Sequence, residues 1–145
     1  MEVIIEKAIP IETPIGLFEN HRDAILLENI EWEHSSKVIF FCNITKNHIK
    51  NTENKTLMQE FSFKIIFFDI ISLFHSEYDT YEAIKKGFPK PGINESVFEI
   101  IENSNYLKDL PIREDYNKEK LNHYYLQTYD DVFNIIACSY KIEML

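Results

Sequence analysis

Glycine is scarce in this chain: Gly16, Gly87 and Gly92 are the only three among 145 residues. Phosphate-binding turns of the G-x-G-x-x-G and G-x-x-x-x-G-K-[ST] types need clustered glycines, because the backbone must approach the phosphates closely. Neither pattern occurs, so these two kinds of nucleotide site are excluded. The same scarcity, together with 45% hydrophobic residues, excludes collagen-like and low-complexity chains and predicts one domain over residues 1–145.

Cysteine and long apolar runs are also lacking. Cys42 and Cys138 are too few for a disulfide framework and lie in apolar runs, which predicts free, buried thiols in a reducing cytoplasm. No histidine or cysteine spacing typical of a metal site and no cofactor motif occurs, so we expect neither group. No apolar run reaches the ~18 residues that span a bilayer, and the N-terminus lacks signal-peptide features, so we expect a cytoplasmic protein without membrane contact.

Arginine is the third scarce residue. Two arginines and 13 lysines oppose 24 acidic residues, which gives a net charge of −9. Phosphate binding depends on clustered Lys and Arg, and the lysine clusters at 46–55 and 85–90 are small, with Phe88 as their one interleaved Phe, Tyr or Trp for base stacking. We therefore expect no nucleic-acid partner. The abundant Ile, Asn, Lys, Phe and Tyr have A/T-rich codons, which indicates a low-GC, bacterial genome.

The apolar patterns predict an α+β domain of about six mostly antiparallel strands, with an open curved sheet or a partial barrel. The strand candidates are residues 2–8, 30–33, 38–44, 57–74, 121–129 and 132–142. A capping box at Asp79 and Glu82 predicts a minor helix that ends at Gly87, and a second box at Ser96 and Glu99 predicts the main helix. Because no glycine is left for a strand interior, we expect curvature to come from β-bulges, above all in residues 57–74.

Asp69 interrupts the apolar face of the longest strand candidate. A buried carboxylate is costly unless it is paired or hydrogen-bonded. One interpretation is a general base or ligand-fixing acid in a pocket beneath the sheet, with His75 or His123 as its proton partner. The other, which we favour, is a bulge near residues 66–68 that turns Asp69 to solvent, or a structural hydrogen bond to a neighbouring strand.

The last strand pair is rich in tyrosine and carries two aspartates at its turn. Tyr125, Tyr129, Asp130 and Asp131 fit a protein-recognition surface, because tyrosine offers a large contact area at a low cost in side-chain entropy. The alternative, which we favour, is a tyrosine face packed on a helix, with the aspartates in an ordinary turn.

No catalytic motif is present, so we expect a small acidic, non-enzymatic protein-binding module whose charge favours a basic partner. In size, acidity and expected compartment the chain resembles the immunity proteins that neutralise bacterial toxins; this likeness is one of class and assigns no residue. The alternatives are a small-molecule-binding domain or a metal-independent enzyme with a pocket around Asp69. An uncovered edge strand, the first or the last, would also permit a homodimer.

Overall fold

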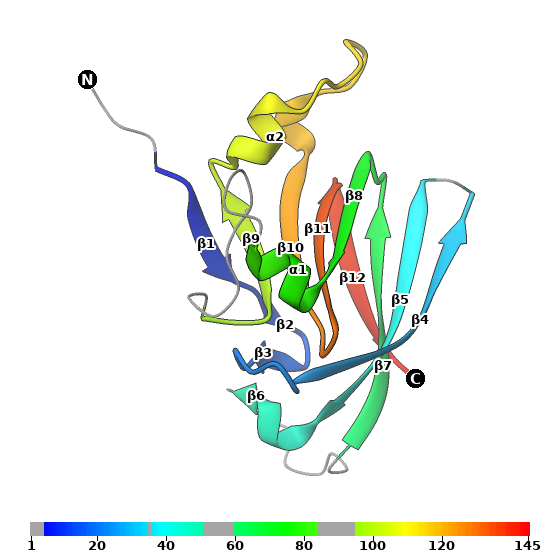
Figure 1. The fold of residues 1–145 in the computed structure, drawn as a ribbon. Helices are drawn as coiled ribbons and strands as arrows, with labels where there is room; N and C mark the ends of the chain where they lie inside the picture. The colour runs from blue at the N-terminus through cyan, green and yellow to red at the C-terminus, as the bar shows by residue number, and fades with distance from the viewer. Residues whose placement is uncertain (1–4, 35, 51–59, 84–94) are drawn as a thin grey trace.

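The computed structural model describes residues 5–34, 36–50, 60–83 and 95–145 (Figure 1). These residues form three sheets with two short helices, and every strand pairing among them is antiparallel. The expected small α+β fold is therefore present. It has twelve strands in the described residues rather than about six, and both helices are minor.

Two larger sheets and one small sheet contain all the strands. The five-stranded sheet has the order β1 (Lys7–Pro10), β9 (Phe98–Glu102), β10 (Asn122–Gln127), β11 (Asp131–Ala137) and β8 (Ser72–Glu77). The four-stranded sheet has the order β12 (Ser139–Met144), β7 (Glu60–Phe68), β5 (Lys37–Thr45) and β4 (Ile25–Glu33). The small sheet contains β2 (Glu12–Thr13), β3 (Gly16–Phe18) and β6 (Ile49–Lys50).

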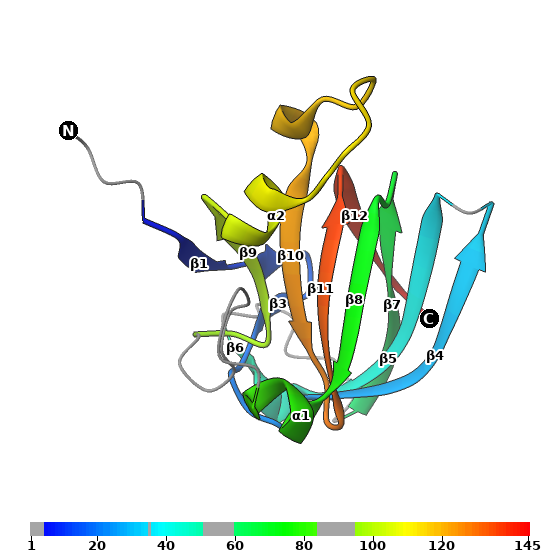
Figure 2. The ribbon, with the colours of Figure 1, turned by 45° about the horizontal axis from the view of Figure 1, so that its top comes forward.

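Short helical elements lie in the connections between the strands. They are η1 (Lys46–His48), α1 (Tyr78–Ala83), α2 (Asn105–Asp109) and η2 (Lys118–Lys120). Figure 2 shows α1 beside the β10–β11 turn at one end of the five-stranded sheet and α2 at the opposite end.

Aromatic rings from both larger sheets fill the space between them. Phe40 lies edge-on to Phe133, with ring centroids 4.9 Å apart, and Phe67 lies 5.3 Å from Tyr124. These four side chains belong to one core cluster and are nearly inaccessible to solvent. Offset and edge-to-face contacts of this kind add to the free energy gained from burial.

A second, smaller cluster lies on the outer face of the five-stranded sheet. It contains Tyr81 of α1 with Ile101, Tyr125 and Val132 of the sheet. Strand β10 is therefore buried on both faces, with Tyr124 in the main core and Tyr125 beneath α1. This explains why its sequence does not alternate between apolar and polar residues.

Two strand candidates, residues 57–74 and 132–142, each cross from one sheet to the other. Ser139 pairs with Phe68, and Ile136 pairs with Ser72, so two residues of one strand oppose three residues of the other. The long strand expected over residues 57–74 is therefore divided at residues 69–71 into β7 and β8, which belong to different sheets; the register shift of the described strands lies instead between Leu27 and Asn29 of β4. Asp69 has a φ of 53° there and is exposed, as in the favoured interpretation that turns it to solvent; the alternative of a buried carboxylate on the strand face is not what the structure has.

The main helix expected at Ser96 is also wrong, because β9 occupies these residues. The Ser96 hydroxyl accepts from the N–H of Phe98, two residues on, and β9 pairs with β1 on one side and β10 on the other. Strand pairing on both sides outweighs a local capping pattern. The helix starts later, at α2, where the Ser104 hydroxyl accepts from the N–H of Leu107.

The minor helix is present as α1, but its cap is Glu77 instead of the predicted Asp79. Its expected end, Gly87, lies outside the described residues.

Both thiols are free: Cys42 is buried, as expected, whereas Cys138 is only half-buried at the bend between β11 and β12.

Candidate functional site

The site residues predicted from the sequence fall into three places. His75, Tyr129, Asp130 and Asp131 lie together at the α1 end of the five-stranded sheet. His123 and Tyr125 are buried on the outer face of that sheet, and Asp69 stands at the exposed bend. The burial of Tyr125 rules out its predicted role as a surface contact.

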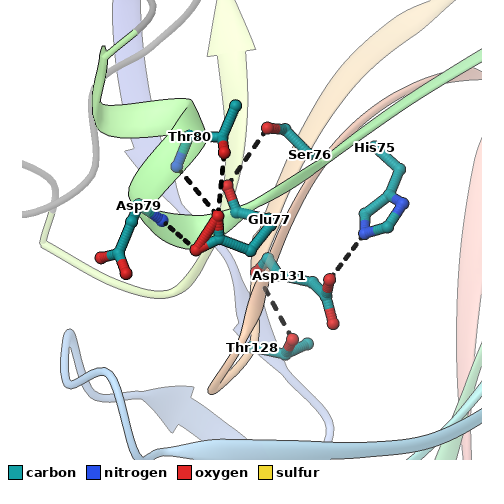
Figure 3. Close-up of polar contacts among 7 residues, drawn as sticks. All are labelled: His75, Ser76, Glu77, Asp79, Thr80, Thr128 and Asp131. Carbon is teal, nitrogen blue, oxygen red and sulfur yellow. Dashed lines mark hydrogen bonds and ion pairs between the residues drawn. The ribbon is translucent and has the colours of Figure 1, made fainter.

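At the α1 end, hydrogen bonds join Glu77 to the first residues of α1, and Figure 3 shows them beside the contacts of Asp131 at the start of β11. The carboxylate of Glu77 accepts from the N–H groups of Asp79, at 2.8 Å, and Thr80, at 3.1 Å. These donors hold the pKa of Glu77 below its usual value. The N–H of Tyr78 donates to the carbonyl of Asp130 at 2.8 Å, so helix and turn form one unit.

His75 and Asp131 point toward each other across neighbouring strands in Figure 3. The Nε2 atom of His75 lies 2.6 Å from Oδ1 of Asp131. The imidazole also stacks on Phe133, with ring centroids 4.8 Å apart. Half of the His75 side chain is exposed, so this pair is a surface contact of fixed geometry.

Arg22, in the loop before β4, contacts residues at the α1 end of the five-stranded sheet. Its Nε donates to the carbonyl of Tyr129 at 2.9 Å, and its guanidinium lies 4.2 Å from the ring centre of Tyr78 and 5.6 Å from that of Tyr129. It also contacts the carboxylate of Asp79 at 3.6 Å. Cation–π contacts and the hydrogen bond fix both tyrosines, although the ring of Tyr129 stays 44% exposed.

Negative charge exceeds positive charge among the described residues of this end. We call the acidic end the carboxylates of three neighbouring segments, which are the loop before β4, residues 77–82 and the β10–β11 turn: Asp23, Glu77, Asp79, Glu82, Asp130 and Asp131. The side chains of Asp79 and Asp23 are 72% and 56% exposed, and that of Asp131 is 28% exposed. Arg22 is the one arginine or lysine of the described residues that contacts them here.

A row of buried polar side chains crosses the outer face of the five-stranded sheet. The Ser104 hydroxyl lies 2.6 Å from Nδ1 of His123, whose Nε2 lies 2.5 Å from Oδ1 of Asn134. The amide of Asn134 donates to the hydroxyl of Tyr81 at 3.0 Å. Burial lowers the pKa of His123 to about 4, so the imidazole is neutral at pH 7.

The order serine, histidine, asparagine also occurs in nucleophilic catalysis, where the histidine accepts the proton of the nucleophile. Here an imidazole of pKa about 4 is a weak base. In addition, the Ser104 oxygen already accepts from the N–H of Leu107, as the cap of α2. This arrangement is suited to fixing one buried hydrogen-bond pattern, and it does not favour acyl transfer.

Strands β9 and β10 separate next to this row. Their pairing ends at Ile100 and Tyr124, although β9 stays paired with β1 to Glu102 and β10 stays paired with β11 to Asn122. A pocket of about 520 Å³ lies in the resulting fork. Its lining includes Ser104 and His123, apolar side chains of β9, α2 and Leu121, and one lysine each from α2 (Lys108) and η2 (Lys118).

Asp69 lines a smaller and separate pocket of about 260 Å³. Its other walls include Ile71, Tyr116, Lys120 and Cys138. His75 and His123 are absent from this lining, so the expected proton partners do not meet Asp69 in this pocket.

Glu99 was not predicted as special, yet it is fully buried on β9, opposite Tyr125. One carboxylate oxygen accepts from the N–H of Glu95 at 3.2 Å, and the other, Oε1, has no partner among the described residues. Burial raises the pKa of Glu99 to about 7. A carboxyl group that stays partly protonated near neutral pH is consistent with its missing partner.

Within the described ranges, no three His, Cys, Asp or Glu side chains are grouped so as to hold a metal ion. The helices of those ranges are all too short or too polar to cross a membrane.

Sequence reasoning missed Arg22, Ser104 as a cap, and Asn134. Ser104 and Asn134 carry no local signal, because they meet His123 only through strand pairing and the placement of α2. Arg22 had one visible signal, since it is one of only two arginines in an acidic chain.

Comparison of the chain with protein-family models, with curated proteins and with solved structures finds no match.

Proposed function

We propose that this chain is a non-enzymatic protein-binding module that uses the acidic end to bind a basic protein. The observation that supports this proposal is the group of exposed carboxylates near Tyr129. They lie on α1 and on the β10–β11 turn, which a backbone hydrogen bond joins into one unit. A basic cytoplasmic toxin is one partner of this class, in line with the likeness to immunity proteins.

Tyr129 supplies the apolar part of the proposed contact. Its ring is 44% exposed, while its carbonyl accepts from Arg22 and its N–H donates to the carbonyl of Ile25. A tyrosine held in this way loses little further entropy on binding, and tyrosines of this kind are common binding hot spots.

Charge supports the proposal at longer range. A net charge of −9 attracts a basic partner and raises the association rate, most strongly at low ionic strength. The core between the two larger sheets is filled by aromatic rings, which argues against a ligand site at the centre of the fold.

Affinity capture from cells of the source organism tests the proposal. The bait is the wild-type chain, compared with a variant that carries Asp79→Lys and Asp130→Lys. The matched control carries Glu31→Lys and Glu114→Lys, which changes the net charge equally but alters exposed residues outside the acidic end. Circular dichroism and thermal unfolding confirm that all three baits are folded.

We expect wild type and control to capture the same basic protein and the acidic-end variant to lose it. Equal capture by all three baits, or no specific capture by the wild-type chain, would contradict the proposal.

A small-molecule-binding function is the second candidate, and the pocket of about 520 Å³ in the β9–β10 fork favours it. Its size is that of a small-ligand site, and Ser104 and His123 provide fixed polar groups beside apolar walls. Leu107→Trp would fill this pocket. A metabolite that raises the melting temperature of the wild-type chain, but not of this variant, would support the second candidate.

A further inference from the structure

The four-stranded sheet ends in an open edge at β12. Among the described residues, β12 pairs with β7 and with no other strand. None of its residues is buried, whereas Phe63, Ile65 and Phe67 on the neighbouring strand are 0% exposed. The free side of β12 is therefore available to another strand.

The backbone of β12 alternates in the direction of its hydrogen-bonding groups. The N–H of Leu145 donates to the carbonyl of Ser62 on β7 at 3.0 Å. Because successive residues of an antiparallel strand face opposite neighbours, Lys141 and Glu143 also direct their backbone groups toward β7. Tyr140, Ile142 and Met144 direct theirs to the free side.

The side chains of β12 alternate as well. Tyr140 and Ile142 pack against the main core, and Lys141 and Glu143 lie on the outer face. Within one chain, Glu143 contacts Lys141 at 2.9 Å and Lys64 of β7 at 3.2 Å. The edge thus carries both signs of charge, although the whole chain has a net charge of −9.

We propose that β12 pairs with β12 of a second copy of this chain across a two-fold axis at Ile142, which joins the two four-stranded sheets into one. In this register Lys141 of each copy lies opposite Glu143 of the other. Tyr140 lies opposite Met144 of the other copy on the core side. The free N–H and C=O groups of both strands then pair with each other.

The charge pattern selects this register. Shifting one strand by two residues keeps the backbone pairing but places Lys141 opposite Lys141, or Glu143 opposite Glu143. Like charges directly opposite one another destabilise an antiparallel pair, and opposite charges stabilise it. Placing the axis at Ile142 is the arrangement in which both outer-face pairs are of opposite charge.

The other edge of the same sheet is built differently. Strand β4 contains Glu28, Glu31 and Glu33 without any lysine or arginine, and its pairing with β5 is shifted between Leu27 and Asn29. Like charges and a bulge both oppose pairing with a second copy. This contrast assigns self-association to β12 and not to β4.

Analytical ultracentrifugation over a concentration series tests the dimer. We expect the wild-type chain to dimerise, and Lys141→Glu and Glu143→Lys each to weaken dimerisation by about tenfold or more, because each creates two like-charged pairs. The matched control, Glu31→Lys on β4, is expected to dimerise as the wild type does. Circular dichroism confirms the fold of each variant.

Mixing the two variants gives the decisive measurement. The Lys141→Glu copy carries two acidic side chains on the outer face of β12, and the Glu143→Lys copy carries two basic ones. In a mixed dimer these faces meet, so both pairs are again of opposite charge. We expect the mixture to recover dimerisation, with the mixed species identified by native mass spectrometry of one tagged and one untagged chain. A monomeric wild type, unaffected single variants, or a mixture that stays monomeric would overturn the proposal.

Discussion

The five-stranded sheet holds two histidines, on opposite faces and at opposite ends, in different surroundings. At one end, His123 is 1% exposed and both ring nitrogens contact neutral groups, Ser104 and Asn134. At the other end, the side chain of His75 is half exposed and its Nε2 contacts the carboxylate of Asp131. We infer that the buried histidine mainly stabilises the fold, whereas the exposed one leaves its neighbourhood accessible to a partner.

The largest expected effect separates the two histidines directly. His123→Ala would leave a cavity and two polar groups without their partner, so we expect the free energy of unfolding to fall by about 4 kcal/mol. His75→Ala is the matched control and is expected to cost less than about 1 kcal/mol, because its pair is at the surface. Urea unfolding at pH 7 measures both values, and similar losses would contradict the comparison.

The second effect is a pH dependence of stability that belongs to His123. Its pKa is about 4 in the folded chain and about 6.5 when unfolded. Below pH 6.5 the unfolded state binds a proton that the folded state does not, so stability falls as the pH drops toward 4. The full shift corresponds to about 3 kcal/mol.

This contribution is isolated by subtracting the unfolding free energies of His123→Gln from those of the wild type between pH 7 and pH 4. We expect the difference in unfolding free energy, wild type minus His123→Gln, to decrease from pH 7 to pH 4. A constant difference would show that His123 has an ordinary pKa.

The third effect comes from Glu99, which lies in the same sheet as His123 but responds in the opposite direction. Its pKa rises from 4.5 to about 7 on burial. Between these values the folded state keeps a proton that the unfolded state has lost, so stability falls as the pH rises. Glu99→Gln removes this ionisation and is expected to stabilise the chain by about 3 kcal/mol at pH 8, relative to wild type.

At pH 4 the carboxyl group is mostly protonated in both states, so the gain from Glu99→Gln should disappear. Thermal unfolding at the two pH values provides the measurement. Glu102→Gln, an exposed residue on the same strand, serves as the control and should show no such pH dependence.

Part of this arrangement could be read from the sequence. Residues 38–44 are apolar except for Asn43, and β5 is largely buried against the core, as that pattern predicts. The exposure of Asp69 was suggested by its position as a charge within an apolar run. The helix expected at Ser96 was wrong, because pairing with β1 and β10 is a long-range effect that a local capping pattern does not report.

The contacts of the two histidines depend on the same long-range pairing. His75 and Asp131 are distant in sequence and meet because β8 lies beside β11. His123 meets Asn134 through the β10–β11 pairing, and Ser104 through the start of α2. The residue types suggested proton-transfer partners for Asp69, but strand order decided their actual neighbours, and the sequence patterns do not encode strand order.

The smallest expected effect is the coupling between His75 and Asp131. A double-mutant cycle with His75→Ala and Asp131→Ala measures it without the other losses of each substitution. Because both side chains are reached by solvent, we expect a coupling of about 0.5 kcal/mol that decreases in high salt. A cycle between His123→Ala and Asn134→Ala should give a larger coupling that salt does not change, since both of those groups are buried. Equal couplings, or equal responses to salt, would contradict the distinction between His123, a buried residue that stabilises the fold, and His75, an exposed residue at the acidic end.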